Sequence, residues 1–318
     1  MKIAILSFTS GLVNRGAETV VKELTTRLSK KHQVEVYSSL SLGIREMRKF
    51  NIQALKEADK FGADVIMPVN GGEQSLLTRL YCLIKGKKMV IIGMAGLGWC
   101  DGWNLLMRPN VFIASTKRNY IWAKKFYGLG VRVETIPHGV DLTKFKMEGK
   151  KRQFAVKGPI ILCVAGPNEY KRVEATIRAV SRLDKGSLVL VGGSDSWEKL
   201  GKRLLKKRFE RIQVSHEELP EVYRGADVFT MVSESSEEFG IVNLEALASG
   251  LPMVVTDDEL RQEILGKYGT YVKDVEGKEY EEKLKQAMKQ RKKCPDKWLE
   301  KFSWDLIASQ FEEILSQL

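Results

Sequence analysis

Two glutamates, Glu237 and Glu245, are the strongest candidates in this chain for a functional site, because their carboxylates could bind the hydroxyl groups of a ligand from two sides. Seven residues separate them, including the run Phe239-Gly240-Ile241. The surrounding pattern predicts a buried strand over 228–232, a helix from about 240 to 249 and a second strand over 253–256. These elements form one βαβ unit, in which Glu237 precedes the helix and Glu245 lies more than one turn inside it.

The turn between this strand and helix is a predicted diphosphate site. The backbone N–H groups of about residues 239–242 have no partner within the helix and lie at the positive end of its dipole. Gly240 lets a ligand approach the backbone closely. We therefore expect a sugar nucleotide here, with Glu237 near hydroxyls of the transferred sugar and Glu245 near those of the ribose.

This segment resembles the retaining GT-B glycosyltransferases of family 4. Their E-x7-E motif is usually followed by A-x-A-x-G-x-P-V-V, and here Glu245 is followed by Ala246-Leu-Ala-Ser-Gly250-Leu-Pro252-Met-Val-Val255. Two further stretches carry the resemblance, Ile136-Pro-His-Gly-Val-Asp141 and Lys301-Phe-Ser-Trp304. The resemblance implies an α/β fold of the GT-B type, with two Rossmann-like domains whose parallel sheets face an interdomain cleft. It also implies that Phe239, Gly240 and Ile241 take part in donor binding.

The loop Gly166-Pro-Asn-Glu-Tyr-Lys171-Arg172 follows a predicted strand and resembles the family loop that neutralises the donor diphosphate. Lys171 matches the family's lysine, and Pro167 stands where the family has an arginine. We expect Arg172 to supply the second cation, because a guanidinium group suits phosphate oxygens. Both cations would act in catalysis by stabilising the charge that gathers on the departing diphosphate.

In the first half of the chain, the resemblance points to Gly16 and Asp101. Gly16 lies in the loop 10–18, where family members have a glycine loop near the donor phosphates. Many members also have a catalytic-site histidine after the strand that here ends at Ile92, but this chain reads Gly93-Met-Ala-Gly-Leu-Gly-Trp-Cys-Asp101. Asp101 is the nearest titratable group. It is expected either to contact the acceptor or sugar, or to form a turn or cap.

Strands and helices alternate along both halves, which predicts parallel sheets covered on both faces. The predicted strands are 2–8, 34–37, 64–69, 88–92, 111–114 and 131–136, then 160–165, 187–191, 211–214, 228–232, 253–256 and 270–272. We expect an N-terminal acceptor domain over 1–145 and a donor domain over 152–299, with the polar segment 147–153 as a linker. By resemblance, a C-terminal helix at about 300–318 packs back on the first domain.

The excess of basic over acidic residues is confined to the first half of the chain. The net charge is +12, and residues 1–150 hold 24 Lys and Arg against 12 Asp and Glu, whereas residues 151–318 hold 28 of each. This asymmetry suggests a sugar, lipid-linked or other anionic acceptor, or a peripheral contact with an anionic membrane.

The candidate for a membrane contact is a helix predicted over 116–127, with Lys117 and Lys124 on one stripe and Trp122 and Phe126 on another. The alternative is that the aromatic side chains of this helix pack in the core. No nucleic-acid-binding motif accompanies the charge, so a nucleic-acid partner is not expected.

The four cysteines lie far apart without metal-ligand spacing, so neither a zinc site nor a disulfide framework is predicted. The first strand begins at Lys2 and no apolar run reaches about 20 residues, which predicts a cytoplasmic protein without a membrane span. The acids at 257–259 are read as a helix start rather than a metal site.

We therefore expect a metal-independent hexosyltransferase that uses a nucleoside diphosphate sugar as co-substrate and no other cofactor. Two alternatives stay open: an epimerase or hydrolase of nucleoside diphosphate sugars on the same fold, and a sugar-nucleotide or polyanion-binding protein with impaired catalysis.

Overall fold

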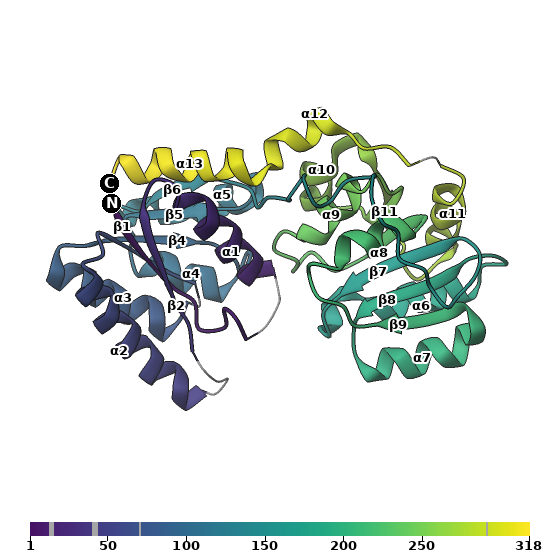
Figure 1. Cartoon of the computed structure of the whole chain (residues 1–318), viewed down its shortest axis with the longest axis horizontal. Helices are drawn as coiled ribbons and strands as arrows, with labels where there is room; N and C mark the ends of the chain where they lie inside the picture. Colours follow the sequence, from purple (N-terminus) through teal and green to yellow (C-terminus); the bar gives the residue numbers. More distant parts are fainter. Residues whose placement is uncertain (13–15, 40–43, 70, 291) are drawn as a thin grey trace. The chain divides into compact units, whose positions relative to one another are not determined.

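A computed structural model of the chain describes residues 1–12, 16–39, 44–69, 71–290 and 292–318, with 44, 45 and 127 described by their backbone alone (Figure 1). The described residues form two compact units. The first comprises Met1–Gly139 together with Trp304–Leu318, and the second comprises Val140–Ser303. Each unit is built around one parallel sheet, so both have the Rossmann-like architecture expected from the alternation of strands and helices.

Within its described residues, the first unit has a six-stranded sheet in the order β2-β1-β3-β4-β5-β6. Its strands are β1 (Lys2–Leu6), β2 (Gln33–Tyr37), β3 (Val65–Pro68), β4 (Lys88–Ile92), β5 (Val111–Ala114) and β6 (Arg132–Thr135). Its helices are α1 (Gly16–Leu28), α2 (Ile44–Phe61), α3 (Glu73–Lys85), α4 (Trp99–Leu106), α5 (Lys117–Ala123), the 3₁₀ helix η1 (Lys124–Leu129) and α13 (Trp304–Ser316).

The second unit has a six-stranded sheet in the order β12-β11-β10-β7-β8-β9 within the described part of the chain. Its strands are β7 (Ile160–Ala165), β8 (Ser187–Gly192), β9 (Phe209–Ile212), β10 (Val228–Met231), β11 (Met253–Thr256) and β12 (Gly269–Val272). Its α-helices are α6 (Val173–Ser181), α7 (Asp195–Leu205), α8 (Leu219–Gly225), α9 (Ile241–Ala248), α10 (Glu259–Leu265), α11 (Lys278–Ala287) and α12 (Asp296–Leu299). Its 3₁₀ helices are η2 (Glu169–Lys171), η3 (Lys206–Arg208), η4 (Gly266–Tyr268) and η5 (Glu300–Phe302).

Four strands, β4, β5, β7 and β11, have the bounds that the sequence predicts. All four lie inside their sheets, and inner strands of a parallel sheet are buried on both faces, so they read as continuous apolar runs. The strand predicted at 211–214 is displaced, because β9 begins at Phe209 and ends at Ile212. β9 is an edge strand with a mixed burial pattern, which gives a weaker sequence signal.

The division between the units lies at Gly139 and Val140, rather than at the polar segment 147–153. That segment is bound to the second unit. Arg224 donates to the carbonyl oxygens of Lys144 and Lys150, at 3.2 and 2.8 Å. The chain returns to the first unit at Trp304, so α13 is part of that unit. There Arg27 of α1 forms an ion pair with Asp305 of α13 at 2.8 Å.

The helix predicted over 116–127 is interrupted. α5 ends at Ala123, and the chain continues as the 3₁₀ helix η1, so the two stripes of the sequence pattern do not lie on one continuous helix. Trp122 and Phe126 are partly buried and pack against the core of the first unit. Their aromatic rings pack against the core, as in the alternative given in the sequence analysis. This segment therefore gives no support for a membrane contact.

Candidate active site

The two glutamates of the E-x7-E pattern flank the start of α9, as the sequence predicts. Gly240 is the residue before this helix and has a left-handed backbone (φ 78°). A side-chain Cβ at Gly240 would come within 2.7 Å of the Asn243 side chain, so conformation and space both favour glycine. The helix is buried over 243–248, which explains how Glu245 comes to be only 3% exposed.

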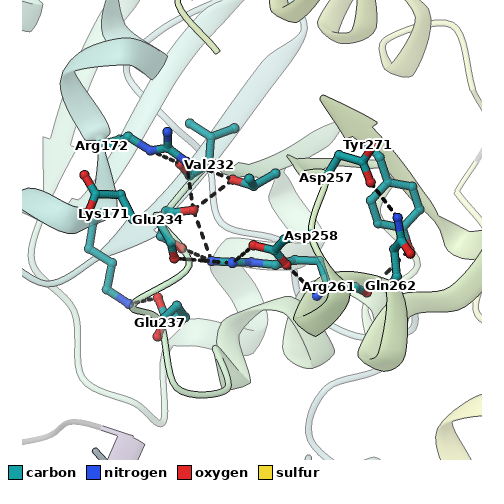
Figure 2. Close-up of polar contacts among 12 residues, drawn as sticks. Lys171, Arg172, Val232, Glu234, Glu237, Asp257, Asp258, Arg261, Gln262 and Tyr271 are labelled. Carbon is teal, nitrogen blue, oxygen red and sulfur yellow. Dashed lines mark hydrogen bonds and ion pairs between the residues drawn. The ribbon is translucent and has the colours of Figure 1, made fainter. Parts of the chain in front are cut away.

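Glu237 forms an ion pair with Lys171 inside the second unit (Figure 2). The Lys171 Nζ atom lies 2.5 Å from Glu237 Oε2, and the two side chains are only 13% and 9% exposed. Lys171 ends η2, directly after β7, while Glu237 lies in the loop between β10 and α9. The structure therefore brings together the predicted phosphate-binding lysine and the predicted sugar-binding glutamate, which are 66 residues apart in the sequence.

Glu245 is held by two residues, Tyr223 and His216, that no motif in the sequence indicates. The Tyr223 hydroxyl donates to Glu245 Oε2 at 2.8 Å, and His216 Nε2 lies 3.1 Å from Glu245 Oε1. The hydrogen bond to Glu245 raises the pKa of His216 above its ordinary value, although burial opposes this. Burial, reinforced by the Glu245 charge, raises the pKa of Tyr223 well above its usual range. Glu245 is thus an oriented carboxylate rather than a loosely solvated one.

Arg172 is oriented toward the backbone of the site loop. Its Nε donates to the Val232 carbonyl oxygen at 2.7 Å and its Nη2 to the Ser233 carbonyl oxygen at 3.1 Å (Figure 2). Arg172 itself has a left-handed backbone (φ 48°), between η2 and α6. These contacts indicate that Arg172 positions the loop that carries Glu237; its expected role in neutralising phosphate stays a prediction.

A second guanidinium group, that of Arg261 in α10, also holds this loop. Arg261 is completely buried and forms an ion pair with Asp258, the N-cap of α10. Its Nη2 donates to the Ser233 carbonyl oxygen at 3.2 Å and its Nη1 to the Glu234 carbonyl oxygen at 3.3 Å (Figure 2). The prediction that the acids at 257–259 begin a helix is confirmed, since Asp258 accepts a hydrogen bond from the Arg261 backbone N–H at 2.9 Å.

Phe239 and Ile241 have side chains directed to the core. Phe239 is 2% exposed and its ring lies edge-on to Phe302, with centroids 6.4 Å apart. Ile241 is partly buried against the same core. The expected contribution of both residues to donor binding is therefore limited to their backbone. Phe302 belongs to the 301–304 motif, and its carbonyl oxygen accepts a hydrogen bond from Val140 of the 136–141 motif at 2.8 Å.

Gly16 and Asp101 belong to the first unit. Gly16 is the exposed first residue of α1, and residues 13–15 of its loop lie outside the described residues. Asp101 lies in the first turn of α4 and is 2% exposed. It accepts hydrogen bonds at 3.1 Å from the Ala95 backbone N–H and from Asn104 Nδ2. These contacts fit the turn-forming role considered for Asp101; its contact with a substrate stays a prediction.

The described residues contain neither a membrane-spanning helix nor a cluster of metal ligands. No helix there is long and apolar enough to cross a bilayer. No three His, Cys, Asp or Glu side chains in the same residues converge in a way that could hold a metal ion.

Comparison with known proteins identifies the second unit. Residues 145–301 match the family described as "Glycosyl transferases group 1". Mannosylfructose-phosphate synthase of Agrobacterium fabrum is 28% identical over 154 residues, which cover 41% of this chain and 34% of that protein. Phosphatidyl-myo-inositol mannosyltransferase of Mycobacterium tuberculosis is 27% identical over 144 residues, covering 43% of this chain and 38% of that protein. Both alignments thus span little more than a third of the curated relative.

Solved structures share the fold over the whole chain. The Anabaena protein HepE, in complex with UDP and glucose, has a TM-score of 0.79 at 16% identity, and the similarity covers 100% of both chains. Sucrose-phosphate synthase from Thermosynechococcus elongatus has a TM-score of 0.78 at 16% identity, covering 99% of this chain and 98% of that one. At such identities the similarity establishes the fold, which is that of the GT-B glycosyltransferases. With the match over residues 145–301, the second unit belongs to the glycosyl transferases group 1 family.

Proposed function

We propose that this chain is a retaining, metal-independent glycosyltransferase that moves a hexose from a nucleoside diphosphate sugar to a hydroxyl of an acceptor. The observation that carries the proposal is the pair of buried carboxylates on either side of Gly240, each with a defined partner: Lys171 for Glu237, and Tyr223 with His216 for Glu245. The family match and the UDP and glucose bound by HepE, a protein of the same fold, support it.

In this proposal, the diphosphate lies against the backbone N–H groups at the start of α9. The helix dipole and the Lys171 ammonium group stabilise the negative charge that develops on it. Glu245 binds the ribose hydroxyls, and Glu237 lies near the sugar carbon, where positive charge develops. The ion pair with Lys171 holds Glu237 beside this diphosphate position.

The bond changes follow a front-face displacement. The bond between the anomeric carbon and the phosphate oxygen breaks, and the bond to the acceptor oxygen forms on the same face of the sugar. The acceptor proton moves to the departing phosphate oxygen, so no histidine base is needed. The acceptor is proposed to bind to the first unit and to be anionic, because residues 1–150 hold 24 basic against 12 acidic residues.

The first experiment identifies the donor. A thermal-shift panel of UDP-, GDP-, ADP- and dTDP-sugars should show one class that stabilises the protein, by about 2.7 kcal/mol at 100 times its dissociation constant. Turnover of that donor should then require a second substrate with a free hydroxyl, and the product should keep the anomeric configuration of the donor. Turnover without an acceptor would indicate the hydrolase or epimerase alternative, and binding without turnover would indicate a binding protein.

The second experiment separates the two glutamates. Glu245→Gln should weaken nucleotide binding, and Glu237→Gln should lower kcat with little change in nucleotide affinity, each by about 1–3 kcal/mol. Glu174→Gln, on the exposed surface of α6, is the matched control and should change neither quantity. Parent-like binding and turnover in both site variants would refute the assignment.

A further inference from the structure

The helix α3 of the first unit has a largely reversed amphipathic character, although Leu77 and Tyr81 are partly buried against the core. Its inward face carries the polar or small residues Gln74, Ser75, Thr78 and Cys82, each at most 1% exposed. The other face carries Leu76, Leu80, Leu83 and Ile84, which are 37%, 48%, 61% and 80% exposed. A helix that covers a sheet normally buries its apolar stripe, so this arrangement requires an explanation.

The reversal is fixed by specific hydrogen bonds between neighbouring helices. Gln74 Nε2 donates to Asn51 Oδ1 of α2 at 3.1 Å, and Ser75 Oγ donates to Asn104 Oδ1 of α4 at 2.6 Å. Turning the helix to bury its leucines would break both contacts and leave buried amide groups without partners, at a large cost. The exposed leucines are therefore a stable feature of the unit.

The apolar surface continues from α3 to α4. Trp103 Nε1 donates to the Gly72 carbonyl oxygen at 3.0 Å, one turn before Leu76. Trp99, the first residue of α4, is 78% exposed and its ring lies 6.4 Å from that of Trp103. We call the set Leu76, Leu80, Leu83, Ile84, Trp99 and Trp103 the α3–α4 surface (both helices are labelled in Figure 1). Large exposed apolar side chains that lie next to one another commonly mark an interaction site.

The charges around the α3–α4 surface are predominantly positive. The segment 73–88 contains four basic residues, Arg79, Lys85, Lys87 and Lys88, and one acid, Glu73. Glu73 is paired with Arg48 of α2 at 3.2 Å, and the nearby Asp59 of α2 is paired with Lys85 at 3.1 Å. The acids next to the surface are thus compensated, and a cationic surplus remains.

We propose that the α3–α4 surface docks on an anionic lipid bilayer. The aliphatic side chains would enter the acyl boundary, the tryptophan rings would lie at the level of the headgroups, and Arg79 and Lys87 would contact lipid phosphates. The surplus of cations disfavours a second copy of the chain as the occupant, since two such surfaces would repel each other. The inference depends only on the first unit, so it is independent of the proposed transferase activity.

Vesicle co-sedimentation tests this proposal with the full chain. Vesicles of phosphatidylglycerol and phosphatidylcholine in equal parts should bind the protein, pure phosphatidylcholine should bind it weakly, and added salt should weaken the anionic binding. The double variant Leu83→Glu/Ile84→Glu should bind at least about tenfold more weakly, because two apolar anchors are replaced by charges at exposed positions. Leu306→Glu is the matched control: it is 42% exposed on α13, which packs against α1, and should bind like the parent.

Trp99→Ser provides a second variant on the other helix, should the double variant fail to fold by circular dichroism, and it too should weaken binding to anionic vesicles. Absence of binding at low salt, or parent-like binding by both α3–α4 variants, would overturn the proposal. Self-association without lipid that the α3–α4 variants abolish would also overturn it, because the surface would then belong to a second copy of the chain.

Discussion

Replacement of Arg261 by Met should destabilise the second unit strongly. The Arg261 guanidinium is completely buried, is paired with Asp258, and donates to the carbonyl oxygens of Ser233 and Glu234. Removing one partner of a buried ion pair costs about 3–5 kcal/mol, because the other charge and its acceptors lose their compensation. For a unit of this size, 1 kcal/mol corresponds to roughly 2–4 °C, so we expect a decrease in melting temperature of about 6–20 °C.

The matched control is Arg178→Met. Arg178 also pairs with an acid on its own helix, Glu174, but the two side chains are 44% and 52% exposed. Such an exposed pair contributes about 0–1 kcal/mol. Differential scanning calorimetry should therefore separate the two variants, and turnover by Arg261→Met below its melting temperature should also fall, since the loop it holds carries Glu237. A melting temperature as high as that of Arg178→Met would refute the argument from burial.

Three further predictions concern the site. Lys171→Met should destabilise the second unit by about 3–5 kcal/mol, since Glu237 loses its cation in a buried position, and the added change Glu237→Gln should recover part of this stability in urea unfolding. His216 has a pKa raised by Glu245, so its stabilising contact is complete below pH 6.5 and is lost as the pH rises through the folded-state pKa. The melting-temperature difference between the parent and His216→Asn should accordingly be larger at pH 6 than at pH 9, and an equal difference at both would contradict the assignment. Turnover should survive EDTA, because Lys171 and the start of α9 already provide positive charge at the proposed diphosphate site; loss on chelation that magnesium or manganese restores would disprove the metal-free proposal.

The sheet scaffold was predictable from local sequence patterns. Inner strands such as Ile160–Ala165 and Met253–Thr256 are apolar runs because helices cover both faces of a parallel sheet. Helix ends were less predictable: the pattern over 116–127 continues past Ala123, but the chain there changes to a 3₁₀ helix. A 3₁₀ helix has poorer hydrogen-bond geometry than an α-helix and is common at helix ends, so we attribute the change to the tertiary packing of Trp122 and Phe126.

The site was predictable in part. Glu237, Gly240 and Glu245 lie on one short segment with a recognisable spacing, so the sequence located them together. Tyr223, His216 and Arg261 come from other elements and have no spacing that relates them to the glutamates. The same reason applies to Arg172: its charge and position in the sequence predict phosphate binding, but they do not reveal its contacts with the carbonyl oxygens of Val232 and Ser233 at the end of β10.

The sequence by itself determined the order of strands and helices, the glycine-containing turn before α9 and the two carboxylates around it, because these depend on short-range periodicity and on conformations that few residues adopt. Only the tertiary structure decided which groups meet. Lys171 reaches Glu237 because β7 and β10 are neighbours in the sheet. The most deeply buried side chains of α3 include Gln74 and Ser75, because Asn51 and Asn104 on adjacent helices supply their hydrogen bonds. Periodicity shows that a helix has two faces, but the neighbours determine which of them is buried.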